Sequence, residues 1–531
     1  MTDPVSETVP KPASAPAVVA GGVDAVDDAA LEPGTAAELR AREEAAMREA
    51  VERWDRRAEE IKGQGLRLGR GYHRRLQQVY RHLIPKGASV LEVGCSRGDL
   101  LASVEPKEGV GLDFSSRMVN LARETYPSAT HPNLDFVHAS ADELDEQLEG
   151  PFDYVILSDL VNELRDVQRV LERVRRVCRP ETRVIVNTYS RVWEPVLSLA
   201  GKLNLARPMV GQNWLTVHDV RNLLVLAGFE PLRTWQEVLL PTVLPGVNGL
   251  FNRFLAKVLP TNQLALANLI VARPSATPIE QRRAGDAGEE PVVSVIVAAR
   301  NESGNIQKIL DRTPKDLGGG TELIFVEGNS SDDTWDMIQR KAEEHADWGV
   351  GIKVMQQDGK GKGDAVRKGF AAANGGVLMI LDADMTVPPE DLPRFYEAIR
   401  SGRGEYINGV RLVYPMEDQA MRFFNLLGNK FFSAAFSFLL GQPIKDTLCG
   451  TKVMTKRHYE QVAAGRSYFG DFDPFGDFDL IFGAAKLNLK MIDLPIRYQA
   501  RTYGDTNIDR WRSGVILLRM TLYAARRLKF V

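Results

Sequence analysis

The stretch from Leu378 to Leu392, with the sequence LMILDADMTVPPEDL, constrains the fold of this chain most strongly. Its four apolar residues from Leu378 to Leu381 predict a short buried strand, and two prolines stop the strand from continuing. Asp382 and Asp384 follow the strand. Two carboxylates at a strand end can hold Mg²⁺ or Mn²⁺, which usually bridges such carboxylates to substrate phosphates. Because an isolated Asp-x-Asp is more often a solvated turn, the interpretation depends on the neighbouring segments.

Length and composition limit the class of protein. A chain of 531 residues is too long for one ordinary core, so we expect at least two domains. The net charge of -3 gives no general attraction to nucleic acid, and we expect no nucleic-acid partner. The 3 cysteines stand far apart, which favours a reducing, cytoplasmic setting without disulfides. No signal peptide and no spanning segment are predicted.

Changes in composition divide the chain. Residues 1–35 are rich in Ala, Pro and Val without periodicity, which predicts a disordered tail. Residues 36–273 form the first predicted domain, and residues 291–531 form the second. Between them, residues 274–290 have the Pro, Gly and charge content of an exposed linker.

In the first domain, polar residues follow successive predicted strands. The segment SVLEVGCSRGDLL, from Ser89, predicts a strand and a helix joined by a turn. Asp113 lies near the end of the second strand, at a distance that suits hydrogen bonds to ribose hydroxyls. Asp142 follows the third strand and Asp159 the fourth. Because helices alternate with these strands, we expect a parallel sheet with ligand at the carboxyl ends of the strands.

Taken together, LEVGCSRG, GLDFS, ADEL and FDYVILSD resemble the class I S-adenosylmethionine-dependent methyltransferases, over about residues 89–273. Ser96 stands where that family usually has the middle glycine of Gly-x-Gly-x-Gly. The resemblance implies S-adenosylmethionine as cofactor, with its methionine part beside Glu92, Gly94 and Gly98, its ribose on Asp113 and its adenine near Asp142.

A hydroxyl methyl acceptor also needs a base. Asp159, Glu163 and His218 are the candidates, although each alone is more often structural or solvated. In the alternative hypothesis, this domain binds the cofactor or docks a partner without catalysis.

The second domain repeats the pattern of strands that end in polar turns. VVSVIVAARNES predicts a β-branched strand that ends at Arg300, Asn301 and Glu302, and ELIFVEGNSSDDT predicts a second strand that ends at Glu327. DGKGKGDAVRKGF then gives a Gly-rich loop whose Lys360 and Lys362 can offer positive charge to phosphate. A flexible solvated connection is an equally good interpretation of that loop alone.

The acidic turn, the Lys-Gly loop and Asp-Ala-Asp, in this order, resemble the family 2 glycosyltransferases of the GT-A fold, and most closely the dolichol-phosphate mannose synthase type. DTLCGTKVM, GDFDPFGDFDL and RTYGDTNIDRW extend the resemblance to the C-terminus. It implies a nucleoside diphosphate-sugar donor and Mg²⁺ or Mn²⁺ on Asp382 and Asp384. The expected nucleotide-sugar contacts are Arg300, Asn301, Glu302, Glu327, Lys360, Lys362, Arg411, Lys452 and Arg501.

The acceptor decides whether a base is needed. A polyprenyl phosphate is already ionised near neutral pH and needs none, whereas a sugar hydroxyl does. For a hydroxyl, Asp477 is our candidate, with Asp471, Asp473 and Asp479 as rivals.

Two segments suit a lipid surface. Residues 421–440 are rich in Phe but carry an uncharged run too short to span, and residues 514–530 end in a basic cluster. A buried core helix is the plainer interpretation of the first segment, but the family resemblance favours the membrane interface. We therefore expect peripheral association with the inner face of the plasma membrane.

The sequence thus predicts two doubly wound α/β domains, a Rossmann-like methyltransferase followed by a GT-A glycosyltransferase. The function expected is a bifunctional, metal-dependent, inverting enzyme that acts on a lipid-phosphate or glycan acceptor. In the alternative, a glycan-elongating glycosyltransferase carries a non-catalytic first domain.

Overall fold

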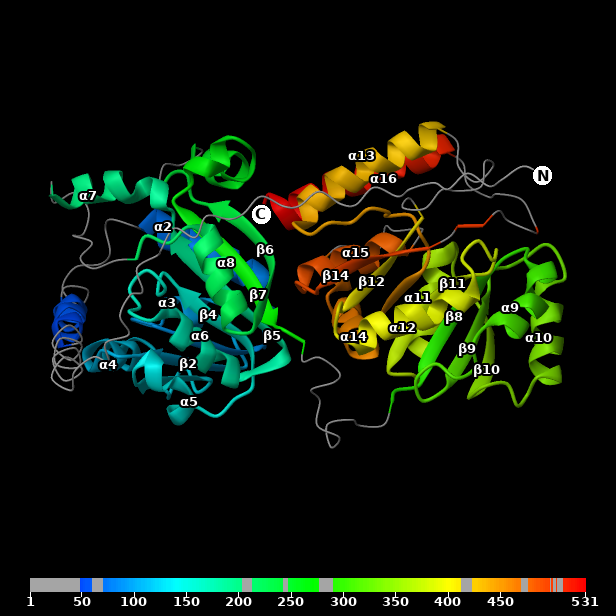
Figure 1. Cartoon of the computed structure of the whole chain (residues 1–531), viewed down its shortest axis with the longest axis horizontal. Helices are drawn as coiled ribbons and strands as arrows, with labels where there is room; N and C mark the ends of the chain where they lie inside the picture. Colours follow the sequence, from blue (N-terminus) through cyan, green and yellow to red (C-terminus); the bar gives the residue numbers. More distant parts are fainter. Residues whose placement is uncertain are drawn as a thin grey trace, which may run out of the picture. The chain divides into compact units, whose positions relative to one another are not determined.

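The computed structural model describes residues 48–59, 70–202, 213–241, 247–276, 290–411, 423–468, 476–496, 498–499, 503 and 510–531. The predicted tail and most of the predicted linker lie outside this part of the chain, as do Asp471, Asp473 and Arg501. Both predicted domains contain a seven-stranded sheet, so the expected pair of α/β domains is confirmed (Figure 1).

The first sheet has the strand order β3-β2-β1-β4-β5-β7-β6. Its first five strands in space are parallel, and β7 runs antiparallel between β5 and β6. The order reverses between β1 and β4, and ligands of doubly wound sheets bind at the carboxyl ends of the strands at such a point. The strands are β1 Ser89–Val93, β2 Glu108–Asp113, β3 Leu134–His138, β4 Phe152–Ser158, β5 Cys178–Tyr189, β6 Phe229–Glu237 and β7 Ala267–Pro274.

Alternate residues of this sheet enter two separate cores. Tyr154 and Ile156 on β4 face one cluster with the residues of α2, whereas Val155 and Leu157 face the other with the residues of α6. This two-residue alternation is what a strand imposes, and it explains why strands covered on both faces are almost continuously apolar. The helices are α2 Arg70–Leu83, α3 Asp99–Ser103, α4 Ser116–Thr125, α5 Leu144–Gln147, α6 Val167–Arg176, α7 Glu194–Lys202 and α8 Val217–Leu226.

The second sheet has the order β10-β9-β8-β11-β13-β12-β14. Strands β8 to β11 are parallel, and the antiparallel β13 joins β11 to β12. Here the order reverses between β8 and β11, which places the end of β11 at the point where ligand is expected. The strands are β8 Val293–Ala299, β9 Thr321–Glu327, β10 Gly351–Gln356, β11 Val377–Asp382, β12 Tyr406–Val410, β13 Lys452–Thr455 and β14 Met491–Pro495.

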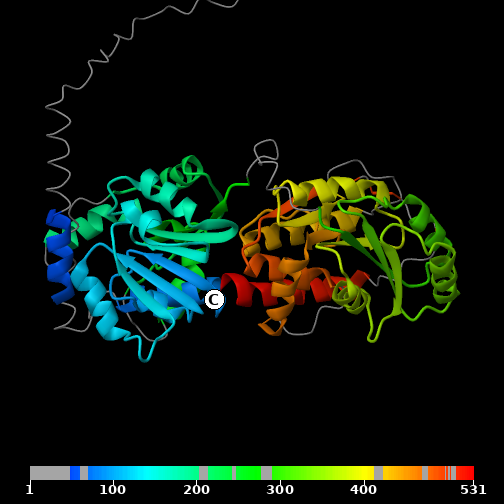
Figure 2. The same ribbon diagram turned by 90° about the horizontal axis from the view of Figure 1, so that it is seen from below.

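Helices cover both faces of this sheet too (Figure 2). One core joins the sheet to α9, α10 and α12, and the other joins it to α11, α13, α14, α15 and α16. The helices are α9 Ile306–Arg312, α10 Thr334–Glu344, α11 Lys362–Ala372, α12 Leu392–Arg400, α13 Phe423–Leu440, α14 Lys456–Ala464, α15 Asp477–Lys486 and α16 Arg510–Ala524.

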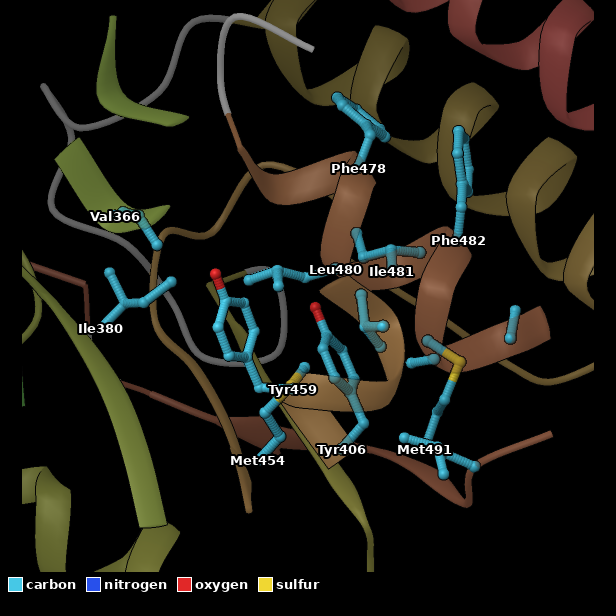
Figure 3. Close-up of a cluster of buried hydrophobic side chains, with 14 of the residues drawn as sticks. Val366, Ile380, Tyr406, Met454, Tyr459, Phe478, Leu480, Ile481, Phe482 and Met491 are labelled. Carbon is cyan, nitrogen blue, oxygen red and sulfur yellow. The ribbon is translucent and has the colours of Figure 1, made fainter. Parts of the chain in front are cut away.

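Aromatic packing fixes α15 over the sheet. Phe478 and Phe482 point from α15 toward the neighbouring helices, while Tyr406 and Tyr459 lie on the sheet side (Figure 3). The ring of Phe436, on α13, has its centroid 5.4 Å from that of Phe478 and 5.6 Å from that of Phe482. Since Asp477 is the first residue of α15, this packing also positions its carboxylate.

Candidate functional site

The polar residues of the second domain gather at one edge of its sheet. Asp382, the last residue of β11, pairs in register with Ala298 of β8, and Ala299 pairs with Glu327 of β9. The turns that follow these three strands therefore lie at the same edge, where Arg300, Asn301 and Asp384 also stand.

An ion pair occupies the end of β11. The Nζ of Lys362, at the start of α11, donates to Oδ1 of Asp382 at 2.5 Å. Burial opposes the charge on Asp382, but attraction to Lys362 lowers the pKa of its carboxyl below the usual range. Burial opposes the charge on Lys362, but the negative charges of Asp382, Asp477 and Asp384 together raise the pKa of Lys362 above its usual value. The predicted loop lysine and the three predicted carboxylates thus form one cluster.

Gly450, in the DTLCGT segment, packs directly against this cluster. A Cβ at that position would collide with both Oδ2 of Asp382 and Nζ of Lys362. Only a residue without a side chain allows backbone to approach the pair so closely. The sequence does not reveal this contact, because a glycine outside a turn signal gives no sign of which residues it touches.

Asp384 is held by its own turn. Its Oδ1 accepts from the backbone N–H of Thr386 at 3.1 Å and from its hydroxyl at 2.8 Å. Asp382 and Asp384 both offer carboxylate oxygens at this edge, and hard oxygen donors are what Mg²⁺ and Mn²⁺ prefer. Within the described ranges, no group of three or more His, Cys, Asp or Glu residues suits a metal by itself. A cation here would therefore depend on the two carboxylates and on substrate phosphate.

Several residues that were predicted to contact the nucleotide form hydrogen bonds within and between the loops that follow β8 and β9. Asn301 donates from its N–H to Ser330 Oγ at 3.0 Å, and its Oδ1 accepts from Ser331 N. Glu302 and Glu327 are buried, and each accepts a hydrogen bond from the residue three positions later in its own loop. Arg300 and Lys360 are exposed.

Arg411 and Lys452 each bind oxygen atoms of the protein itself. The guanidinium of Arg411 donates two hydrogen bonds to the buried carboxylate of Asp446, at 2.7 and 2.9 Å. Although burial would raise it, this pair lowers the pKa of Asp446 to about 2. Lys452 is buried, and its Nζ donates to Asn408 Oδ1 and Cys449 O. Both cations still act on Asp382 through their charge, because they help to lower its pKa.

Asp477 is buried at the start of α15, whereas its rival Asp479 accepts an ion-paired hydrogen bond from Arg466 at 2.7 Å. The turn before Asp477 packs tightly on α11, since a Cβ on Gly476 would lie 2.5 Å from Gly363 Cα. The helix that carries Lys362 and the helix that carries Asp477 therefore begin side by side.

In the first domain, the Gly-rich turn and Asp113 form one unit. Asp113 is buried at the end of β2, where its two oxygens accept from Ser96 N at 2.8 Å and Ser115 N at 2.9 Å. Burial raises the pKa of Asp113 despite these bonds. Ser96 has a φ of 48°, a left-handed conformation that explains why glycine is usual there.

Gly98 is required by the same turn. It has a φ of 80°, and a Cβ there would lie 2.5 Å from the ring of Phe136. Glu92 lies beneath the turn, where its Oε2 accepts from Leu101 N at 2.9 Å and burial raises its pKa well above the usual range. Gly94 also has a positive φ, of 75°. Asp142 is partly exposed, with Arg169 Nε 3.8 Å from its Oδ1.

Asp159 lies at the end of β4 in a network that the sequence did not reveal. Its Oδ1 accepts from the hydroxyl of Tyr72 at 2.7 Å and from Nδ2 of Asn187 at 2.5 Å. Tyr72 stacks on Tyr189, with ring centroids 5.7 Å apart. Burial raises the pKa of Asp159 to about 7. Tyr72 is 87 residues away in sequence, so no local spacing could have linked it to Asp159.

The other two candidate bases are placed differently. Glu163 and His218 are both exposed, and His218 follows the Thr216 cap of α8. Burial outweighs the hydrogen bonds from Tyr72 and Asn187, which lower the pKa of Asp159, and a pKa of about 7 suits a base near neutral pH.

Two family models match the chain. The model described as glycosyl transferase family 2 covers residues 294–462, and the model described as methyltransferase domain covers residues 91–184. The first segment contains Asp382 and Asp384, and the second contains Asp113 and Asp159.

Relatives of known name match the second domain. The chain is 27% identical to a dolichyl-phosphate hexose transferase of Haloferax volcanii over 42% of this chain and 90% of that protein. It is 35% identical to a dolichol-phosphate mannosyltransferase of Pyrococcus furiosus, over 21% of this chain but only 30% of that protein.

A solved structure matches the first domain. It is a SAM-dependent methyltransferase of Thermotoga maritima, titled a possible histamine N-methyltransferase, with 16% identity over 41% of this chain and 97% of that chain and a TM-score of 0.32. With both family models and the two sheet topologies, the chain carries an N-terminal methyltransferase domain and a C-terminal family 2 glycosyltransferase domain.

Proposed function

We propose that the second domain transfers a sugar from a nucleoside diphosphate to a polyprenyl phosphate. The observation that carries this proposal is the cluster of Asp382, Asp384, Lys362 and Asp477 at the point where the strand order reverses. Acidic residues there suit a cation that binds a diphosphate, and the lysine suits the diphosphate itself. The names of the relatives support a lipid-phosphate acceptor.

The reaction breaks the bond between the anomeric carbon and the β-phosphate oxygen. An oxygen of the acceptor phosphate attacks the anomeric carbon from the opposite side, so the configuration inverts and the nucleoside diphosphate leaves. A bound Mg²⁺ or Mn²⁺ would supply positive charge to that leaving group. Lys362 stands beside Asp382, and the positive charges of Arg411 and Lys452 also act on this carboxylate, so three cations can offset negative charge that grows there. The acceptor phosphate is already ionised, so no proton has to be removed.

The first domain is proposed to transfer a methyl group from S-adenosylmethionine. The turn of Ser96 and Gly98 with Asp113 supports this cofactor, because a buried carboxylate beside an open backbone turn suits a ribose. Asp159 is placed to accept the proton of a hydroxyl acceptor, with Tyr72 and Asn187 orienting its carboxylate. In-line attack on the sulfonium then depends on how closely the acceptor is held.

The two activities are tested separately. Incubating the full chain with a panel of nucleotide sugars, polyprenyl phosphate and Mn²⁺, followed by mass spectrometry, should reveal a lipid-linked sugar phosphate. Transfer to oligosaccharides but never to the lipid phosphate would instead favour a glycan-elongating enzyme. Calorimetric titration with S-adenosylhomocysteine tests the first domain, and binding without methyl transfer to any product would favour a non-catalytic domain.

A further inference from the structure

Between β6 and β7, the methyltransferase domain has a segment of short helices that exposes apolar side chains and buries polar ones, and we call this segment the insertion. The insertion consists of the short helices η3 Gly249–Phe254, η4 Leu255–Lys257 and η5 Thr261–Leu264. Its exposed side chains are large and apolar, and three of them are more than half exposed: Leu250 at 55%, Leu259 at 69% and Leu264 at 59%. A helix on the surface of a soluble domain normally turns such residues inward.

The inner side of the insertion is polar and fixed to the sheet. The side chain of Asn252 donates to Leu240 O and accepts from Leu240 N, both at 2.8 Å. Lys257 is buried, with its Nζ 3.0 Å from the buried carboxylate of Glu237. A rotation that buried the leucines would expose this ion pair and break both hydrogen bonds, so the apolar side is held outward.

The apolar side continues onto α7. Trp193, just before α7, donates from Nε1 to Leu264 O at 2.8 Å, which joins the two segments. We call their combined exposed face the insertion surface. Of the 19 large apolar residues exposed in the described part of the chain, 10 belong to it, so it is a concentrated patch rather than scattered exposure. These are Val192, Val196, Leu199, Val247, Leu250, Phe251, Phe254, Val258, Leu259 and Leu264.

The charge around the insertion favours an anionic partner. The sequence contains no Asp or Glu from Val238 to Ile279, whereas Arg253 is exposed in the middle of the apolar residues. The guanidinium of Arg253 lies 5.8 Å from the centre of the Phe254 ring, and its Nε donates to Phe530 O at 2.6 Å, which leaves its two NH₂ groups for a headgroup. On the α7 side, the carboxylate of Glu194 lies 3.9 Å from Arg191 Nε. An apolar face with an arginine and with its one carboxylate next to a cation is suited to anionic lipid headgroups above acyl chains.

We propose that the insertion surface docks the methyltransferase domain onto an anionic lipid bilayer. Within the described ranges, no helix is both long and apolar enough to cross a membrane, so the contact would be one of partial insertion. One edge of this surface meets the C-terminal segment after α16, because the Phe254 ring stacks on that of Phe530 with centroids 5.2 Å apart. The proposal does not depend on the sugar transfer proposed above. It makes the methyl acceptor a molecule that reaches the domain at the bilayer surface.

An environment-sensitive probe at a single position tests the contact. The full chain would carry Cys178→Ser and Leu259→Cys, labelled with the fluorophore NBD, because the remaining Cys95 and Cys449 are buried. Vesicles of phosphatidylglycerol and phosphatidylcholine should raise the emission at least about two-fold and shift it to the blue, and doxyl-labelled lipid should quench it. Labelled Val350→Cys, which is 55% exposed in the second domain, is the matched control and should not respond.

Charge and folding are controlled in the same protein. Arg253→Glu should weaken the response of the 259 probe several-fold on anionic vesicles, while binding of S-adenosylhomocysteine stays unchanged. Vesicles without anionic lipid should give a smaller response than anionic vesicles.

Two results would overturn the proposal. One is a silent probe at 259 when a probe at Phe431→Cys responds, which would leave membrane contact to the second domain alone. The other is a blue shift at 259 that appears on raising the protein concentration without vesicles, because the insertion surface would then join two copies of the chain.

Discussion

At the scale of single residues, the most informative contact is the ion pair of Lys362 with Asp382. The lysine neutralises a carboxylate that we assign to a divalent cation, so a cation and the lysine compete for Asp382. Nucleoside diphosphate can relieve this competition by drawing the ammonium toward its phosphates. The chain should therefore bind Mn²⁺ weakly alone and more tightly with nucleotide.

Lys362→Met should remove this competition. In the absence of nucleotide, the variant should bind Mn²⁺ about 5- to 30-fold more tightly than the wild type, as expected for the loss of one partly buried opposing charge. Free Mn²⁺ measured by electron paramagnetic resonance gives the affinity without any enzyme assay. Lys360→Met, at the exposed neighbouring lysine, is the control. Equal Mn²⁺ affinity in wild type and Lys362→Met would show that the lysine does not compete for Asp382.

Asp159 makes the methyltransferase domain sensitive to pH. Its folded pKa of about 7 lies above the ordinary value of about 3.9, so ionising it is harder in the folded state. As pH rises from about 4 to about 7, the unfolded chain loses this proton first, and folding stability falls. Asp159→Asn should remove that slope and gain about 3 kcal/mol of stability, relative to the wild type, at pH 8 compared with pH 5.

Urea unfolding of both proteins at the two pH values measures the difference. In the wild type, methyl transfer should also rise with pH through about 7, because only the carboxylate accepts a proton. Equal differences between variant and wild type at pH 5 and pH 8 would mean that the carboxyl ionises normally.

Substitution of Asp477 distinguishes a polyprenyl phosphate acceptor from a hydroxyl acceptor. With a polyprenyl phosphate, Asp477→Asn should keep much of its turnover, because the nucleophile is already charged. With a hydroxyl acceptor, loss of the base should cost about 100- to 10,000-fold. Turnover numbers from initial rates decide between them, with Mn²⁺ affinity as the check that the cluster is intact.

At the scale of helices and strands, α15 connects the core to the site. Phe478 is fully buried between Phe436 and Phe482, and the preceding residue is Asp477. Phe478→Ala should cost about 3–5 kcal/mol in the free energy of unfolding, and sugar transfer should fall with it. Phe431 on α13 is 60% exposed, so Phe431→Ala should change the free energy of unfolding by less than about 0.5 kcal/mol. Urea denaturation of both variants checks the contrast, and equal costs would contradict the packing described.

The sequence predicted the strand ends well because their signals are local. The apolar run before Asp382 became β11, and β1 and β2 end beside Gly94 and at Asp113 as expected. The aromatic segment was harder, because Phe436 is buried in the core whereas Phe431 and Phe438 on the same helix are exposed. Figure 1 shows α13 beside α16, a pairing that divides the phenylalanines between core and surface and that composition does not reveal.

Contacts between segments that are distant along the chain could not be predicted from the sequence. The expected roles of Glu302, Glu327 and Lys452 remain predictions, and their burial depends on turns and strands that meet only in the fold. The same holds for Gly450 over Asp382 and for Tyr72 at Asp159. The exposure of the apolar side chains of the insertion could not be predicted either, because the spacing of apolar residues does not show which face of a helix points to solvent.

At the scale of the whole molecule, two transferase domains share one chain. Fusion suggests that methyl and sugar transfer serve the same glycan or glycolipid, and lipid contact by both domains would bring their substrates to one surface. Distant sites usually act independently, so damage to one site should leave the other intact.

One measurement tests the central claim most directly, namely sugar transfer to polyprenyl phosphate at the Asp382–Asp384 site. Wild type and Asp384→Asn would be incubated with the active nucleotide sugar, polyprenyl phosphate and Mn²⁺, and the lipid product followed by mass spectrometry. We predict a lipid-linked sugar from the wild type and a loss of at least about 100-fold in the variant, with unchanged S-adenosylhomocysteine affinity. Full lipid glycosylation by Asp384→Asn would contradict the account.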